Sequence, residues 1–299
     1  MLSRRQAIVG AAAFAALIAA GPASAQEKLK VVTSFSILAD FVKNVGGERV
    51  DLVSLVGPNG DAHVYAPSPA DAKKIADAKV VIVNGLGFEG WINRLVKASG
   101  TKAPVVVATK GVKSRKAGGG HGHDDSDPHA WQSIQNAKIY VANIRDALVA
   151  ADPAGKSVYE VNATSYLAKL DALETEVKAE IARIPADRRR IITTHDAFGY
   201  FHDAYGIDFI APVGVSTESE ASARDIAKII TQIKKQKIPA VFMENVSDPR
   251  LVKRIADETG AKVGGTLFSD ALSDDKGPAP TYIDMMRNNL KQFSVALMS

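Results

Sequence analysis

Short, nearly continuous apolar runs alternate with helical patterns along this chain, and that alternation limits its fold more than any other feature. In the first half the runs are Leu29 to Thr33, Val50 to Val56, Val80 to Val83 and Pro104 to Ala108. Runs without polar alternation are typical of parallel strands that are buried on both faces. The segments between them, Ile37 to Val45 and Pro69 to Ala78, have helical character, and Ser68 is a favourable helix start. This order predicts an open parallel sheet.

The second half of the chain repeats this order. Three runs are predicted as strands and three segments as helices: Arg190 to Thr194, Ala240 to Met243 and Lys262 to Gly264, then Ser222 to Lys235, Pro249 to Thr259 and Tyr282 to Phe293. Between the halves, Ala154 to Ile184 carries apolar residues at helical spacing, which predicts one helix of roughly 45 Å. We therefore expect an α/β fold with two lobes, joined by this helix, and a ligand site in the cleft between them.

We divide the chain into an export signal (1–25), an N-terminal lobe (26–153), a linking helix (154–185) and a C-terminal lobe (186–299). The signal is indicated by Arg4 and Arg5, a following apolar run too short to span a bilayer, and the cleavage pattern Ala23-Ser24-Ala25. Ser3-Arg4-Arg5 resembles a twin-arginine signal, and an ordinary secretory signal is the equal alternative. Either route predicts a periplasmic protein.

The composition excludes several classes of protein. Hydrophobic residues make up 46% and charged residues 23% of the 299, as in ordinary globular proteins. The formal net charge is +4, and two of the positive charges lie in the signal, so no nucleic-acid partner is expected. The chain has no cysteine, which excludes disulfides and thiolate metal sites. Any metal site must therefore use histidine and carboxylate. We expect a monomer without a lipid anchor.

Three of the six histidines are candidate ligands by their position. His63 and His195 each follow a predicted strand, which is where open α/β sheets bind ligands, and His129 follows a polar segment. Each has an aspartate within two residues: Asp61, Asp196 and Asp127, respectively. Such aspartates can orient an imidazole, and the alternative is that they form turns and caps. His202 is interpreted as a packing or surface residue.

The polar segment from Ser114 to Asp127 is expected to be a flexible loop. It contains the candidates for weak secondary metal capture, His121, His123, Asp124 and Asp125. A solvated linker that binds no metal is the equal alternative.

A glycine motif from Gly85 to Gly90 matches G-x-G-x-x-G after a predicted strand. A dinucleotide site would also need an acid about 20 residues further on. No acid occurs from Trp91 to His123, so we interpret these glycines as turn residues.

Four motifs in this order carry a resemblance to a known family. They are Gly60-Asp61-Ala62-His63, Asn84-Gly-Leu-Gly-Phe-Glu-Gly-Trp91, Asp127-Pro-His-Ala-Trp131 and Thr194-His-Asp-Ala-Phe-Gly-Tyr200. With the long helix between the last two, the chain after the signal resembles the substrate-binding proteins of bacterial zinc and manganese ABC importers, the cluster A-I or zinc-uptake type. The resemblance implies Rossmann-like lobes and one metal ion held by His63, His129, His195 and, from Phe268-Ser-Asp-Ala-Leu272, Asp270.

The resemblance further implies a receptor that binds Zn²⁺ tightly and delivers it to an inner-membrane ABC permease, with a periplasmic metallochaperone as a further candidate partner. Three imidazoles and one carboxylate suit Zn²⁺, and a receptor for Mn²⁺ is the alternative. Four protein ligands leave no position for a reacting water, so no enzyme activity is expected; an exported metallohydrolase is the less favoured alternative. Affinity should weaken as the pH falls through histidine protonation near about 6.5 or below.

Overall fold

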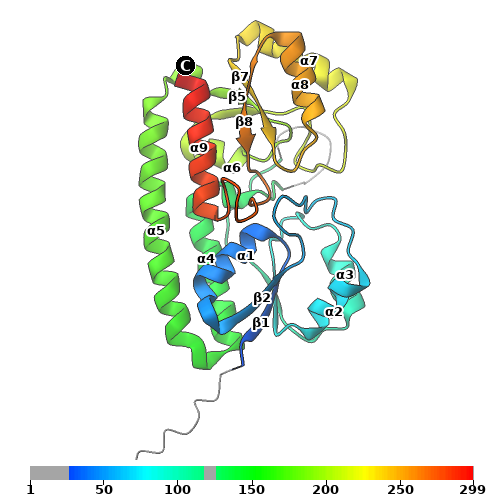
Figure 1. Ribbon diagram of the computed structural model, residues 1–299, viewed down its shortest axis with the longest axis vertical. Helices are drawn as coiled ribbons and strands as arrows, with labels where there is room; N and C mark the ends of the chain where they lie inside the picture. The colour runs from blue at the N-terminus through cyan, green and yellow to red at the C-terminus, as the bar shows by residue number, and fades with distance from the viewer. Residues whose placement is uncertain (1–26, 118–125, 299) are drawn as a thin grey trace, which may run out of the picture.

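The computed structural model describes residues 27–117 and 126–298, which form two lobes beside one long helix (Figure 1). The N-terminal lobe contains four parallel strands in the order β2-β1-β3-β4. Their bounds are β1 (Leu29–Thr33), β2 (Val50–Ser54), β3 (Val80–Val83) and β4 (Val105–Val107). Every residue of β3 is buried, as expected for a central parallel strand. All four strands lie within the apolar runs of the sequence.

The C-terminal lobe contains a second sheet of four parallel strands, in the order β6-β5-β7-β8. Their bounds are β5 (Arg190–Ile192), β6 (Asp208–Ile210), β7 (Ala240–Glu244) and β8 (Lys262–Leu267). The short edge strand β6 was not expected, because three residues are too few to show a pattern. The predicted fold class is confirmed: two α/β lobes with parallel sheets, joined by a long helix.

The long helix is α5 (Lys156–Arg183), whose 28 residues span about 42 Å. It starts two residues later than predicted, because Pro153–Gly155 form a short 3₁₀ turn. Three helices pack along it: α1 (Ser36–Gly46), α4 (Ile134–Ala151) and α9 (Tyr282–Met298). Figure 1 shows α5 running past both lobes, with α9 beside its upper half.

The remaining helices cover the two sheets. They are α2 (Pro69–Asp77) and α3 (Ile92–Ser99) in the first lobe, and α6 (Gly199–Tyr205), α7 (Ala223–Gln236) and α8 (Pro249–Thr259) in the second. Further short 3₁₀ turns are η1 (Gly47–Arg49), η2 (Ala130–Gln132) and η4 (Ala186–Arg188). The predicted start of α2 is correct: the Ser68 hydroxyl and the Asp71 carboxylate each accept the other residue's backbone N–H. Helices α3, α4 and α6 were not predicted.

Helix α4 was missed although the sequence carries a signal for it. Its buried residues recur every three or four positions along one face, as in Ile134, Ala137, Val141, Ile144 and Leu148. That face packs against α1, α5, β3 and β4.

The main apolar core continues through both lobes. It includes Val31 and Phe41 of the first lobe, Leu170 of α5, and Phe242 and Phe293 of the second. A separate, smaller cluster lies between the C-terminal sheet and helices α7 and α8. Because one core serves both halves, the domain boundaries proposed from the sequence stay a prediction.

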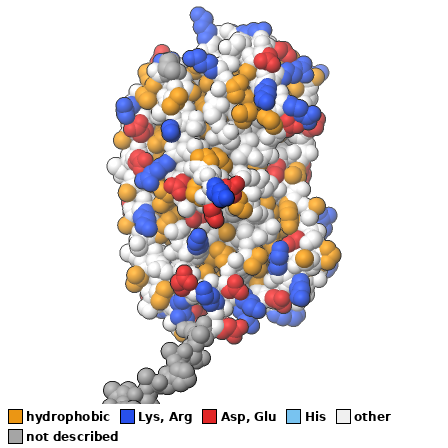
Figure 2. All heavy atoms as spheres, viewed as in Figure 1, with side chains coloured by type: hydrophobic (Ala, Val, Ile, Leu, Met, Phe, Trp, Pro, Cys, Tyr) orange, Lys and Arg blue, Asp and Glu red, His pale blue; other side chains and the backbone are white. Residues whose placement is uncertain are grey.

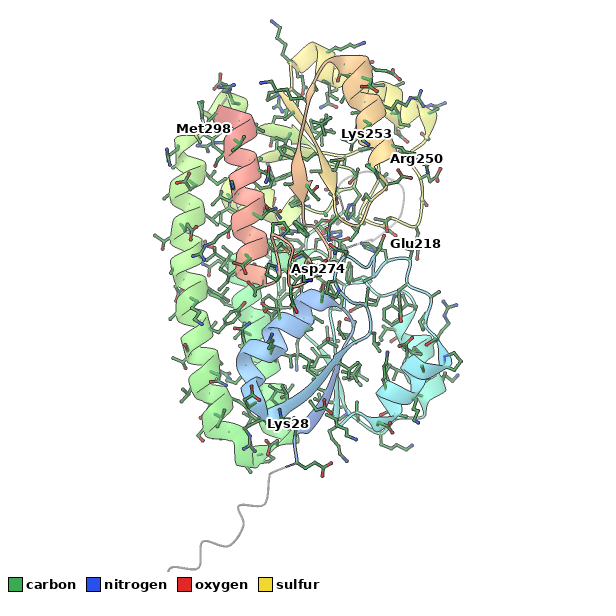
Figure 3. The ribbon with its side chains drawn as sticks, in the orientation of Figure 1. Lys28, Glu218, Arg250, Lys253, Asp274 and Met298 are labelled. Atoms are coloured by element: carbon green, nitrogen blue, oxygen red, sulfur yellow. The ribbon has the colours of Figure 1, made fainter. Side chains whose placement is uncertain are left out.

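One face of the molecule carries charges of both signs, with hydrophobic side chains scattered among them (Figure 2). In Figure 3, Asp274 lies where the two lobes meet, and Glu218 projects from the C-terminal lobe at the same level. Among the described residues, no helix combines the length and the apolar character needed to cross a bilayer.

Candidate metal centre

Four side chains from distant parts of the chain meet where the lobes touch. His63 follows β2, His129 begins the turn η2, His195 follows β5, and Asp270 lies three residues beyond β8. One ligand atom of each lies within 4.8 Å of the others. The four residues are 5%, 0%, 1% and 0% exposed, respectively. The structure thus brings together the ligand set that the resemblance implied.

The distances in this cluster fit a small cation. His195 Nε2 lies 3.1 Å and His63 Nε2 lies 3.4 Å from Asp270 Oδ2. His63 Nε2 lies 3.3 Å from His129 Nε2, which is 3.5 Å from Asp270 Oδ1. Donors bound tetrahedrally at zinc distances would be about 3.3 Å apart. Asp270 Oδ1 is buried without a hydrogen-bond partner among the described residues, so a cation would satisfy it.

His63 is held through its backbone. Its N–H donates to Asp61 Oδ1 at 2.9 Å, and Trp91 Nε1 donates to the preceding carbonyl, Ala62 O, at 2.7 Å. The Phe88 ring packs edge-on against the His63 ring, with centroids 4.7 Å apart. Asp61 therefore fixes the turn that carries His63, and its contact is to the main chain.

His129 is oriented by Asp127, as the sequence suggested. Asp127 Oδ1 lies 2.8 Å from His129 Nδ1 and also accepts the His129 N–H at 2.9 Å. This places the ring hydrogen on Nδ1 and leaves Nε2 for a metal. Asp127 Oδ2 pairs at 2.8 Å with Arg115, which also bonds Asp203 of α6 at 3.0 Å. A Cβ on Gly199 would lie 1.5 Å from Arg115 Nη1, so only glycine leaves room for this arginine.

His195 is oriented by Glu244, the last residue of β7. Glu244 Oε2 lies 2.5 Å from His195 Nδ1, and Oε1 accepts the N–H groups of Thr194 and His195 at 2.7 and 3.0 Å. Asp196, the candidate from the sequence, instead donates its N–H to the carbonyls of Val213 and Gly214. Sequence reasoning missed Glu244. The available signal was an acid directly after the apolar run Ala240 to Met243.

Asp270 is attached to the N-terminal lobe although it follows the last strand of the other sheet. The preceding carbonyl, Ser269 O, accepts bonds from Trp131 Nε1 at 2.8 Å and Gln132 Nε2 at 2.9 Å. Two residues further on, the Leu272 N–H donates to Ser36 Oγ at 3.0 Å. Asp270 is therefore fixed to the same body as His63 and His129.

The glycine motif lies beside the metal site, and its polar groups are bonded within the protein. Glu89 is buried, and its carboxylate accepts hydrogen bonds from Ser34 Oγ and from the N–H groups of Asn84 and Gly85. Those N–H groups are therefore unavailable to cradle a phosphate. Asn84 Nδ2 in turn donates to Pro128 O at 2.9 Å, beside His129.

The charges in the site reinforce one another. Burial tends to lower the pKa of His129, but the charges of Asp270 and Asp127 outweigh it and raise that pKa to about 9. Burial also opposes the charged form of His195, yet Glu244 and Asp270 hold its pKa well above the ordinary value. The pKa of Asp270 stays well below its usual range, because the charges of His195 and His129 overcome the effect of burial.

Two further groups of residues were singled out in the sequence. His121, His123, Asp124 and Asp125 fall outside the described residues. Lys116 and Ser126, on either side of that gap, form an antiparallel bridge. His202 Nδ1 lies 3.1 Å from both Ile207 O and Asp208 Oδ1, away from the cluster.

Comparison with known proteins gives a consistent picture of what this chain resembles. A family model described as the periplasmic component A of zinc-uptake complexes matches residues 31–296. The chain is 35% identical over 272 residues to the iron-binding protein YfeA of Yersinia pestis, covering 91% of this chain and 87% of the relative. It is 35% identical over 267 residues to the manganese-binding lipoprotein MntA of Halalkalibacterium halodurans, covering 89% and 88%.

A solved structure agrees with these sequence matches. The periplasmic zinc binding protein TroA from Treponema pallidum matches with a TM-score of 0.86 at 30% identity, covering 90% of this chain and 99% of that chain. The three proteins are named for iron, manganese and zinc, so they agree on metal binding and differ in the metal.

Proposed function

The chain belongs to the family of periplasmic metal-binding components of zinc-uptake complexes, and on that premise we propose that its cargo is Zn²⁺. Further relatives of this chain are named substrate-binding lipoproteins of manganese ABC transporters, which implies a membrane permease as the partner. We propose that the chain binds one zinc ion with high affinity through His63, His129, His195 and Asp270. The loaded protein then delivers the ion to the permease in the inner membrane.

The observation that carries this proposal is the buried set of three imidazoles and one carboxylate. Imidazole nitrogen suits zinc, whereas manganese favours sites richer in oxygen. His195 supplies a third nitrogen at a position that a second carboxylate could otherwise occupy. The carboxylates of Asp127 and Glu244 face the outer ring nitrogens of His129 and His195, which makes those rings stronger ligands.

Manganese is the second candidate cargo. Both oxygens of Asp270 face the cluster, Oδ1 toward His129 and Oδ2 toward His63 and His195. A bidentate carboxylate would supply a fifth donor, and manganese favours oxygen donors. The name of the MntA relative makes this alternative concrete.

Carriage rather than catalysis is supported by the way the site is closed. The four donors are at most 5% exposed, and together they complete the shell of a tetrahedral ion. Of the nearby acids, Asp127 and Glu244 already face histidine rings, so neither is free to act as a general base.

Export without a lipid anchor stays part of the proposal. The MntA relative is named a lipoprotein, and lipid attachment of that kind uses a cysteine, which this chain lacks. Weak metal capture by the segment around His121 and His123 also stays a prediction.

Metal analysis of the protein purified from its native periplasm tests the cargo, with one zinc per chain as the expected result. Calorimetric titration tests the ligands: His129→Ala should weaken zinc binding more than about 100-fold, because it removes a direct ligand. His202→Ala is the matched control and should bind as the wild type does. Unchanged affinity in His129→Ala would contradict the ligand set, and manganese in the native protein would replace zinc as the cargo.

A further inference from the structure

The four candidate ligands are held unequally by the two lobes. His63, His129 and Asp270 belong to one body, since the residues around Asp270 are bonded to Trp131 and Gln132 beside His129. Asp270 also follows a strand of the C-terminal sheet, but His195 is the ligand that lies directly after such a strand, β5, and faces Glu244 of β7. His195 therefore forms the wall of the cluster that the C-terminal sheet supplies.

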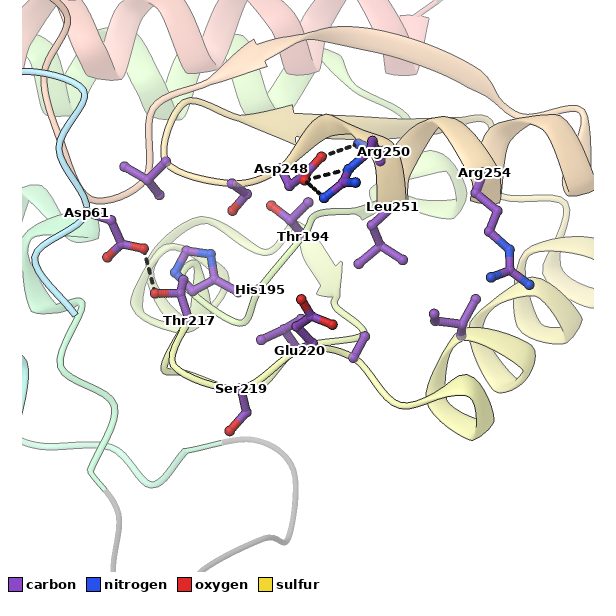
Figure 4. A pocket seen from close by; sticks show the side chains of 15 residues that line it. Asp61, Thr194, His195, Thr217, Ser219, Glu220, Asp248, Arg250, Leu251 and Arg254 are labelled. Atoms are coloured by element: carbon purple, nitrogen blue, oxygen red, sulfur yellow. Dashed lines mark hydrogen bonds and ion pairs between the residues drawn. The ribbon is translucent and has the colours of Figure 1, made fainter. Parts of the chain in front are cut away.

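A pocket of about 490 Å³ opens on that same side. It lies beyond the ends of β5 and β7, next to α8, and His195 is the one candidate ligand that lines it (Figure 4). Thr194 also lines the pocket, and its buried hydroxyl has no hydrogen-bond partner among the described residues. The pocket thus reaches the wall of the metal site that His195 forms.

Two side-chain hydrogen bonds join the lobes beside this pocket. Asn245 Nδ2, next to the lining residue Val246, donates to Asn59 Oδ1 at 3.2 Å, and the other bond joins two residues that line the pocket. Thr217 Oγ1, on the segment between β6 and α7, donates to Asp61 Oδ2 at 2.6 Å, and both residues line the pocket. In Figure 4 this bond lies at the end of the pocket where the His195 ring is seen. The neighbouring residue Glu218 also approaches the first lobe, since a Cβ on Gly90 would lie 3.9 Å from its Oε1.

Asp61 links this bond to the metal site. Its other oxygen, Oδ1, accepts the backbone N–H of His63 at 2.9 Å. One carboxylate therefore holds the turn that carries a candidate ligand and, at the same time, the segment that closes the pocket. A bond between a hydroxyl and a charged carboxylate is stronger than a neutral one.

We propose that the Asp61–Thr217 hydrogen bond is a latch that sets the rate at which metal enters and leaves through this pocket. Thr217 acts as a positioning residue, since among the described residues its hydroxyl bonds to Asp61 and to none of the four ligands. When the latch opens, the segment carrying Thr217 moves away from Asp61, and the freed carboxylate faces the pocket and attracts the incoming cation. This inference rests on the proposed metal-binding function.

The test compares Thr217→Val, which removes the donor, with Thr217→Ser, which keeps it. Thr231→Val is the matched control, because the Thr231 hydroxyl bonds only to its own helix at Ala227 O among the described residues. Dissociation of Zn²⁺ is followed into an excess of a fluorescent chelator. Association is followed by tryptophan fluorescence, because the Trp131 ring lies 5.3 Å from the His129 ring.

Thr217→Val should raise both the dissociation and the association rate of Zn²⁺ by about tenfold, as expected for the loss of one charged hydrogen bond. The equilibrium affinity should change much less than either rate. Thr217→Ser and Thr231→Val should match the wild type.

Two results would overturn the latch. One is unchanged rates in Thr217→Val. The other is faster dissociation without faster association, which would mean that Thr217 only supports the geometry of the ligands. Failure of the wild-type protein to bind Zn²⁺ would instead count against the proposed function, so the two failures are distinguishable.

Discussion

His129 and His195 stand in similar surroundings, yet the carboxylates that orient them are used differently. At His129, a single oxygen of Asp127 serves both the ring and the backbone N–H, and the other oxygen pairs with Arg115. At His195, the two oxygens of Glu244 have separate partners: Oε1 accepts two backbone N–H groups, and Oε2 faces only the ring. The first arrangement needs one good acceptor atom, whereas the second needs two.

The largest expected effect is the dependence of zinc affinity on pH, because both histidine rings should lose a proton when they bind the metal. The pKa of His129 is raised to about 9 and that of His195 well above its ordinary value, so both rings carry protons at pH 7 without metal. Zinc must displace them, and its affinity should rise with pH by up to about 100-fold per unit until the pH nears about 9. This range lies above the threshold near pH 6.5 expected from the sequence.

Calorimetry in buffers with different ionisation enthalpies should show about two protons released per zinc at pH 7. His129→Ala should release about one proton fewer than the wild type. Release of less than one proton by the wild type would contradict the raised pKa values of both rings.

The raised pKa of His129 should make the metal-free protein less stable as the pH rises, whereas zinc affinity increases over the same range. Protonated His129 contributes stability that is fully present below its ordinary pKa of 6.5 and is lost as the pH rises through about 9. The midpoint of thermal unfolding of the metal-free protein should therefore fall between pH 7 and 9.5. The zinc-loaded protein is the control, and its midpoint should not fall over this range.

The comparison between the two carboxylates can be tested directly by amide substitutions. In Glu244→Gln, one amide oxygen cannot serve both the backbone N–H groups and the ring, so either His195 takes the wrong tautomer or its backbone loses an acceptor. Zinc affinity should fall by about 10–100-fold. In Asp127→Asn, the amide oxygen can replace Oδ1 for the ring and the backbone together, so the loss should stay below about tenfold.

Competition titrations against a zinc chelator measure both losses, and the visible spectrum of bound Co²⁺ reports whether the geometry changes. If Asp127→Asn loses as much zinc affinity as Glu244→Gln or more, the separate partners of the two Glu244 oxygens have no effect on zinc binding.

The smallest expected effect is that of Arg115. Its guanidinium reaches Asp127 and Asp203 at the same time, which a single ammonium group does not reproduce. Arg115→Lys should weaken zinc binding by about threefold, because Asp127 keeps its contact with the ring but loses geometric support. Arg145→Lys, at an exposed pair with Asp146, is the matched control and should have no effect. A loss in Arg115→Lys as large as that in Glu244→Gln would contradict this ranking.

The sequence was most informative where the cause of a structure is local. Apolar runs predicted seven of the eight strands in the described chain, and the start of α2 followed from Ser68 and Pro69. The pairing of Asp127 with His129 could also be predicted, because the two lie two residues apart. Helix α4 was missed even though its buried residues recur at helical spacing, so this miss was an error of interpretation rather than a lack of local signal.

The chain by itself determined the α/β order, the long helix and the chemical types of the candidate ligands, because these depend on spacing and composition. Only the tertiary structure decided which polar groups inside the molecule and between its lobes become partners. Glu244 meets the backbone of His195 across 49 positions, and Thr217 meets Asp61 across 156. A buried polar group must find a partner wherever packing provides one, since leaving it unpaired costs about 1–3 kcal/mol. The partner is set by tertiary packing, so it cannot be predicted from local spacing in the sequence.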